Sequence, residues 1–193
     1  APHSGAAESR IFYGWWVAAA FSLIIFLATG IRFAVGPFLK PIVGDLGIDR
    51  GTFSLVIALS LFLYGAFVPL IGPLVDRWGS RVVCSLGTVV IAVSLALTST
   101  MHSVWEFTLY YGVLAALGLA ATGQVVASAT LARWFVKRRG TAVSVLSVAA
   151  MAGVSLLVPI VMWCILHFGW RATFMILGAA SLVVGLPMSL WVL

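Results

Sequence analysis

The fold is decided by ten residues that interrupt two long apolar runs, Gly72-Pro73-Leu74-Val75-Asp76-Arg77-Trp78-Gly79-Ser80-Arg81. Three of these residues, Asp76, Arg77 and Arg81, carry charge at the point where the apolar pattern stops. The glycine and proline residues of the stretch permit a tight reversal of the chain. We therefore expect a cytoplasmic loop here, joining two membrane-spanning helices.

The composition of the whole chain indicates a membrane protein. Of its 193 residues, 63% are apolar and 8% are charged, whereas soluble domains carry about 25% charged residues. The net charge of +6 does not predict a nucleic-acid partner. The basic residues lie singly or in small groups between apolar runs, which is the pattern of cytoplasmic loops in membrane proteins.

The apolar runs predict an all-α membrane protein with six transmembrane helices. The runs are much longer than the roughly 9–11 residues of a barrel strand and do not alternate in polarity, so they are helices. Residues 1–12 form a cytoplasmic lead-in, and residues 13–193 form the helical bundle. The expected spans are approximately 13–38, 52–74, 82–100, 105–131, 140–166 and 172–193.

The distribution of basic residues predicts the orientation in the membrane. Seven basic residues fall on the side of the N-terminus and of the Gly72–Arg81 stretch, and three fall on the other side. Because basic residues are enriched in cytoplasmic loops, we expect a cytoplasmic N-terminus in the cell inner (plasma) membrane.

Two halves of the chain share a weak internal repeat. Three sets of residues recur at an offset of 89 or 90 positions: Arg50-Gly51-Thr52 with Arg139-Gly140-Thr141, Pro69 with Pro159, and Gly79-Ser80-Arg81 with Gly169-Trp170-Arg171. This offset covers three helices, so the repeats, 13–100 and 105–193, are expected to be inverted across the membrane in a 3+3 arrangement. The alternative is that the apparent repeat arises because glycine, proline and arginine are common where membrane helices meet loops.

Arg32 is the sharpest candidate for substrate binding, because it lies inside the first expected span. A charge near the middle of a bilayer costs at least about 2.5 kcal/mol, and such residues usually face a bundle interior or water. The guanidinium matches a carboxylate, so we expect Arg32 to bind an organic anion. The alternative is that Arg32 snorkels to the outer headgroups.

Four polar residues inside the spans are weaker candidates for the substrate path: Thr29, Tyr64, Gln124 and Ser147. Polar residues in membrane helices also bond to neighbouring helices, which is the alternative for each of them. The sequence contains no set of residues typical of an enzyme, a metal site or a cofactor site. No Asp or Glu lies in the middle of a span, so this chain shows no embedded acid for a proton relay.

The spacing of Gly72, Leu74, Asp76-Arg77, Gly79 and Arg81 resembles the signature loop between the second and third helices of the major facilitator superfamily. The resemblance implies that the aspartate and arginines tie cytoplasmic helix ends together and so control the conformation. We assign this conformational gating to six residues: Gly72, Asp76, Arg77, Gly79, Arg81 and Arg139.

A second resemblance concerns the branch of the superfamily. Gly14-Trp15 and the run from Ala132 to Ala142 are similar to the corresponding segments of bacterial monocarboxylate transporters and oxalate/formate antiporters. The resemblance implies transport of small monocarboxylates of the lactate or pyruvate type, often by symport with a proton.

The resemblance covers only the first six of the superfamily's twelve helices. It therefore implies a half-transporter that works by alternating access together with a second six-helix unit, expected to be another copy in a homodimer. One alternative is a truncated or engineered half-transporter that folds and assembles without transporting. Another is an anion exchanger for dicarboxylates or formate.

Overall fold

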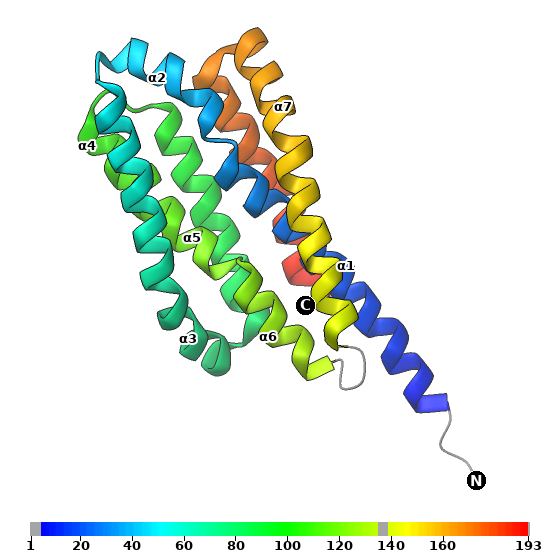
Figure 1. Ribbon diagram of the computed structural model, residues 1–193. Coiled ribbons are helices and arrows are strands. Elements are labelled where there is room, and N and C mark those ends of the chain that lie inside the picture. Colours follow the sequence, from blue (N-terminus) through cyan, green and yellow to red (C-terminus); the bar gives the residue numbers. More distant parts are fainter. Residues whose placement is uncertain (1–4, 135–138, 193) are drawn as a thin grey trace.

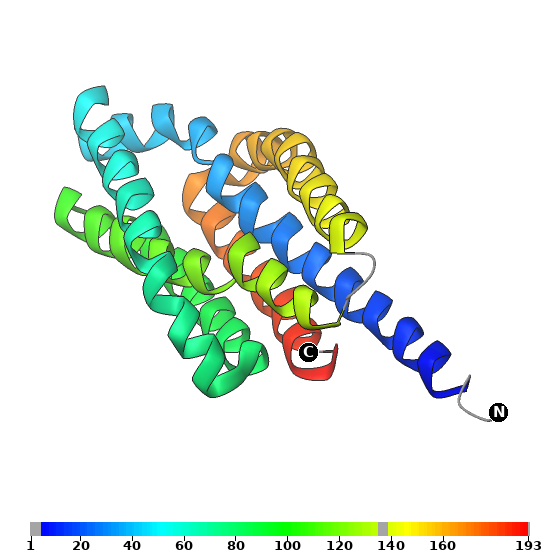
Figure 2. The same cartoon turned by 60° about the horizontal axis from the view of Figure 1, so that its bottom comes forward.

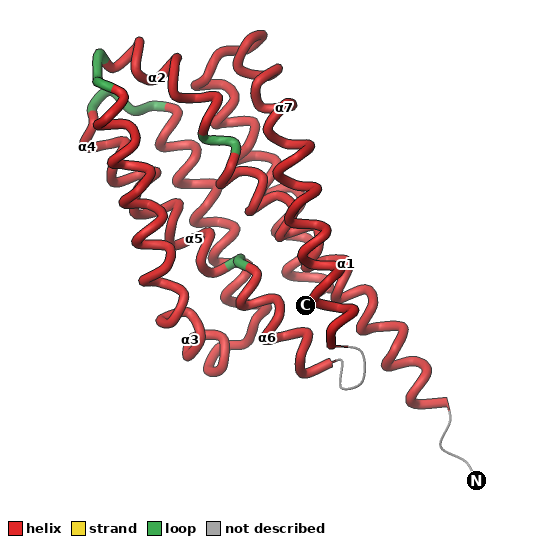
Figure 3. The backbone as a smooth tube through the Cα atoms, in the orientation of Figure 1, coloured by secondary structure: helices red, strands yellow, loops and turns green. Residues whose placement is uncertain are grey.

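The computed structural model describes the backbone of residues 5–134 and 139–192. Within these ranges every regular element is helical and no strand occurs, as the tube in Figure 3 shows. The elements, in chain order, are α1 (Gly5–Phe33), η1 (Gly36–Phe38), α2 (Leu39–Leu46), α3 (Arg50–Ser99), α4 (Val104–Phe107), η2 (Thr108–Ala115), α5 (Ala116–Ala121), α6 (Gln124–Trp134), α7 (Arg139–Ala180), η3 (Ser181–Gly185) and η4 (Met188–Val192).

Four stretches of the described chain are long and apolar enough to cross a membrane: Trp15–Leu46, Arg50–Ser99, Val104–Leu131 and Gly140–Leu190. Figures 1 and 2 show the helices gathered side by side into one bundle, with the short helix α2 across one end. The expectation of an all-α protein built from apolar helices is therefore confirmed for the described residues.

The helices α3 and α7 each contain one sharp break at a glycine. Gly79 has φ 82° and ψ 155°, and Gly169 has φ 81° and ψ 165°. This backbone conformation is open essentially only to glycine, because a Cβ clashes there. At each break the chain turns back on itself, at opposite ends of the bundle (Figure 1).

The Gly72–Arg81 stretch differs from the loop expected from its sequence. The helix α3 continues through Asp76 and Trp78, and the reversal is confined to Gly79. Pro73 lies inside the helix, which membrane helices tolerate because neighbouring groups bond to the backbone groups that a proline frees. The reversal was thus predicted correctly, but the length of the loop was not.

Glycines allow two pairs of helices to approach closely. A Cβ added to Gly30 of α1 would lie 2.8 Å from the Gly153 carbonyl oxygen of α7, and one added to Gly153 would strike the Phe26 carbonyl. A Cβ added to Gly118 of α5 would lie 2.9 Å from the Gly87 carbonyl oxygen of α3. Close backbone approach of this kind holds membrane helices together by van der Waals packing.

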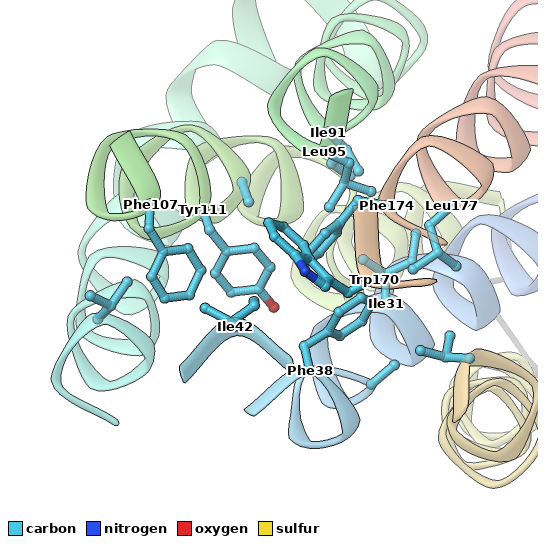
Figure 4. Packing of buried hydrophobic residues seen from close by; sticks show 14 of the residues in the cluster. Ile31, Phe38, Ile42, Ile91, Leu95, Phe107, Tyr111, Trp170, Phe174 and Leu177 are labelled. Atoms are coloured by element: carbon cyan, nitrogen blue, oxygen red, sulfur yellow. The ribbon is translucent and has the colours of Figure 1, made fainter. Parts of the chain in front are cut away.

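A buried aromatic cluster closes the end of the bundle beneath α2. The rings of Phe38 and Phe174 stack with centroids 4.1 Å apart, and Tyr111 and Trp170 pack around them (Figure 4). The indole Nε1 of Trp170 donates a hydrogen bond of 2.8 Å to Asp45 Oδ2 on α2. The sequence analysis did not anticipate α2, which ends at Leu46 and is followed by Gly47 with a positive φ of 61°.

The π-helical segment η2 is stabilised by serines from both parts of α3. A π-helical turn is rare and loosens the regular hydrogen-bond ladder. The hydroxyl of Ser94 donates to the Tyr110 carbonyl at 2.6 Å, and the hydroxyl of Ser60 donates to the Tyr111 carbonyl at 3.4 Å. These bonds hold η2 against α3 and keep Tyr111 buried.

Candidate functional site

Arg32 lies in the last turn of α1, and its side chain is partly buried. Its guanidinium carbon is 3.7 Å from the centroid of the Tyr64 ring on α3. This is a cation–π contact, which is strongest where water is excluded. Within the described part of the chain, no carboxylate lies within ion-pair distance of Arg32, so no acidic side chain there balances the positive charge of its guanidinium.

A second feature of the site is a break in the helical backbone between α5 and α6. The break consists of Thr122 and Gly123, inside the stretch Val104–Leu131 that is apolar enough to span a membrane. The Thr122 N–H still donates to the Gly118 carbonyl at 3.1 Å, and the Gly123 N–H donates to the Ala120 carbonyl at 3.4 Å. Irregular backbone at membrane depth occurs only where protein covers it or it lines an aqueous cavity.

Tyr64 joins Arg32 to this break. A Cβ added to Gly123 would lie 3.0 Å from the Tyr64 hydroxyl oxygen. The ring of Tyr64 therefore faces the guanidinium of Arg32, while its hydroxyl sits at the break. Three segments that are distant in sequence, α1, the first part of α3 and the α5–α6 break, meet at this one side chain.

Gln124 and Ser147 form a separate contact at the start of α6. The amide Nε2 of Gln124 donates to the hydroxyl of Ser147 on α7 at 3.1 Å. The Ser147 hydroxyl in turn donates to the Val143 carbonyl at 3.1 Å. For this pair the structure has the bond between neighbouring helices that the sequence analysis kept as the alternative.

The structure thus brings the five candidate residues together in part. Arg32 is in contact with Tyr64, and Gln124 follows directly after the glycine beside Tyr64. Thr29 is partly buried one turn before Arg32, and it makes no hydrogen bond through its side chain to the described residues. Sequence reasoning missed Gly123, although a glycine directly before a polar residue in a small-residue run is a usable signal.

Five of the six gating candidates lie at or near the break in the middle of α3, and the sixth, Arg139, begins α7. Gly72 and Asp76 line a hollow of about 100 Å³ together with Ala120 of α5 and Val126 and Ala129 of α6. Within the same stretch, the side chains of Arg77 and Arg81 are exposed, and Gly79 makes the reversal. The backbone of Arg139 begins α7, but its side chain lies outside the described residues.

The described residues offer no metal site, because no three His, Cys, Asp or Glu side chains among them are close enough to share an ion. The comparison with known protein families identifies one family.

Residues 21–193 match the family model described as Major Facilitator Superfamily. This match covers nearly all of the helical bundle.

Several curated proteins are similar to this chain. The Uncharacterized MFS-type transporter YcxA of Bacillus subtilis (strain 168) is 30% identical over 151 residues, which cover 78% of this chain and 37% of that protein. Monocarboxylate transporter 11 of Mus musculus is 31% identical over 170 residues, covering 88% of this chain and 38% of the relative. Monocarboxylate transporter 3 of Mus musculus is 29% identical over 181 residues, which cover 94% of this chain and 37% of that protein.

The chain therefore spans less than two fifths of the length of these relatives. The matched family consists of transporters and not of enzymes. From the family match over residues 21–193, together with the apolar helices and the relatives, it follows that this chain belongs to the major facilitator superfamily of membrane transporters.

Proposed function

We propose that the chain is a six-helix half of a secondary transporter for small monocarboxylates, with Arg32 as the group that binds the anion. The observation that carries the proposal is a partly buried guanidinium inside the apolar stretch Trp15–Leu46, 3.7 Å from the centroid of the Tyr64 ring. No acidic side chain of the described residues forms an ion pair with it. The similarity to proteins named monocarboxylate transporters adds support.

The surroundings of Arg32 favour a planar monoanion. The Tyr64 ring lies against the guanidinium, 3.7 Å from its central carbon, so a ligand would meet the N–H groups that point away from the ring, which form a fork that matches a carboxylate. One arginine compensates one negative charge. A dicarboxylate would leave a second charge uncompensated in a poorly solvated site, which is costly. We therefore favour lactate- or pyruvate-type acids over a dicarboxylate exchange.

We further propose six spans in an inverted 3+3 repeat. The breaks at Gly79 and Gly169 lie 90 residues apart and have nearly the same φ and ψ. Pro69 and Pro159, also 90 residues apart, lie inside the helices that precede these breaks. This agreement supports dividing α3 and α7 into two spans each, with a loop at the same position of each repeat.

A second six-helix unit is proposed to complete the substrate path by alternating access. Large apolar side chains are exposed on α3 and α7, among them Phe62 at 72% and Val148 at 68%. We propose another copy of the chain in a homodimer as this unit, in the inner (plasma) membrane with a cytoplasmic N-terminus. Symport through an acid embedded in a span would instead require a different chain as the second unit, because the five acidic residues of this chain lie in loops or at the ends of the expected spans.

Uptake of labelled lactate into proteoliposomes tests the proposal. Arg32→Ala is expected to lower the apparent affinity by about 30-fold or more, because truncating one member of a buried charged pair costs about 2–5 kcal/mol. Lys40→Ala is the matched control, since Lys40 is basic, exposed and two turns further along. Undiminished uptake by Arg32→Ala would refute the site. Folded protein that takes up no lactate in any form would support a half-transporter that only assembles.

A further inference from the structure

The hydroxyl of Tyr64 occupies a notch that exists because residue 123 is glycine. A Cβ at position 123 would be 3.0 Å from the Tyr64 hydroxyl oxygen and 3.1 Å from the Leu119 carbonyl oxygen. Both separations are shorter than ordinary van der Waals contact between carbon and oxygen. The space at Gly123 is therefore filled on one side by fixed backbone and on the other by the end of a tyrosine side chain.

A side chain at this position would displace Tyr64 in preference to the backbone. The Leu119 carbonyl belongs to helix α5 and is held by the packing of α5 against α3, whereas the tyrosine ring turns about its side-chain torsions. Any such turn moves the surface on which the guanidinium of Arg32 lies, since that contact is only 3.7 Å long. The position of Arg32 is thus linked to the size of residue 123 through Tyr64.

We propose that Gly123 is a positioning residue for the anion site: its missing side chain fixes the Tyr64 ring, and the ring fixes the Arg32 guanidinium with its edge donors open to substrate. The inference rests on the proposed function of Arg32, because it assumes that the anion binds there. It assigns a role in substrate affinity to a backbone break that touches no charged group itself. The next residue, Gln124, bonds to Ser147, so the same break also connects the site to α7.

The alternative is that Gly123 serves only the backbone geometry of the α5–α6 break. The two roles differ in how they respond to removal of the Tyr64 hydroxyl. Replacing Tyr64 by phenylalanine keeps the ring under Arg32 and opens the notch by one oxygen atom. The substitution Tyr64→Phe does not relieve the clash between a Cβ at position 123 and the Leu119 carbonyl oxygen.

The test is equilibrium binding of lactate to the purified protein in four forms: unmodified, Gly123→Ala, Tyr64→Phe and the double variant. Gly123→Ala is expected to weaken binding about tenfold, a coupling typical of residues in contact. Tyr64→Phe supplies the reference affinity of a site without the hydroxyl, and the double variant should bind as tightly as Tyr64→Phe, because the added Cβ then meets no hydroxyl. Gly65→Ala is the matched control, because a Cβ there meets no atom within 4 Å.

Each contrary result has a distinct meaning. If Gly123→Ala weakens binding as much in the Tyr64→Phe background as it does in the unmodified protein, the glycine acts through the backbone and the inference is wrong. If Gly123→Ala binds as tightly as the unmodified protein while Arg32→Ala does not bind, the inference fails and the proposed function stands. If the unmodified protein binds no lactate, both are overturned. Melting temperatures of all forms separate lost affinity from lost folding.

Discussion

The two glycine reversals have the same backbone and different surroundings. At Gly169, the following residue Trp170 is 6% exposed, and its indole donates to Asp45 at 2.8 Å. The next residue, Arg171, donates to the Ser99 carbonyl at 3.2 Å, and its guanidinium lies 4.5 Å from the Trp170 ring. At Gly79, the neighbouring Trp78 is 52% exposed.

This contrast shows that a glycine supplies the turn and its neighbours supply the rigidity. The reversal at Gly169 is bound to α2 and to the end of α3 within the same chain. The reversal at Gly79 leaves Trp78, Arg77 and Arg81 exposed. A conformational change is drawn from the less restrained parts of a structure. The difference agrees with the gating role that the resemblance implies for the Gly72–Arg81 stretch.

Truncating the two tryptophans gives the largest expected difference between the ends. Trp170→Ala removes a buried indole and is expected to lower the free energy of unfolding by about 3–5 kcal/mol. Trp78→Ala is expected to change it by about 0.5 kcal/mol or less, because half of that side chain is exposed. Thermal unfolding of the detergent-solubilised protein measures both. Equal losses would show that the two reversals are equally anchored.

The glycines themselves are expected to behave alike. Gly79→Ala and Gly169→Ala each place a Cβ in a conformation reserved for glycine, at a cost of about 1–3 kcal/mol. Neither Cβ would meet another atom within 4 Å, so the cost comes from the backbone alone. Gly44→Ala, in the helix α2 with open space around it, is the control without strain. Tolerance of alanine at only one reversal would break the parallel.

Asp45→Ala is expected to have a smaller effect on the anchored end. It removes the acceptor for the Trp170 indole and leaves that donor without its partner, which costs about 1–2 kcal/mol. Lys40→Ala on the same short helix α2 is the control, and the free energy of unfolding is again the measurement. An unchanged value for Asp45→Ala would mean that the aromatic packing of Trp170 alone holds this end.

The smallest expected effect concerns pH at the start of α3. Hydrogen bonds from the side chain and backbone of Thr52 lower the pKa of Asp49 below its ordinary value of 3.8. A lowered carboxyl pKa stabilises the fold above that ordinary value, and this contribution is lost as the pH falls through the folded-state pKa. In the Asp49→Asn variant, the melting temperature should therefore fall slightly less between pH 5 and pH 3 than it does in the unmodified protein. A melting temperature that falls more steeply with decreasing pH in the variant would show that folding does not lower the pKa of Asp49.

The sequence predicted the helical class and the positions of the reversals, because a bilayer limits the length of an apolar helix and glycine is needed where the chain turns back. It did not predict α2, since a short helix lying across one end has no long apolar run. It also extended the loop over Asp76 and Trp78, because the charges of Asp76 and Arg77 interrupt the apolar run although the helix continues through them.

The candidate site shows the same division. Arg32 was recognisable as a charge inside an apolar run, which is a local property of the sequence. Its contact with Tyr64 depends on the rotation of α1 against α3, and that rotation is set by packing between residues far apart in the chain. The notch at Gly123 was missed for the same reason, since nothing in the adjacent sequence states which side chain fills it.

The interlocked glycines of α1 and α7 limit how this protein can move. Gly30 and Gly153 bring the backbones of α1 and α7 so close that a sliding movement of one helix would drive a carbonyl group into the other helix. If α1 moves in the proposed transport, we therefore expect the first part of α7 to move with it, and Arg32 in the last turn of α1 to move with both. A small tilt of this pair of helices would then displace the charge of Arg32.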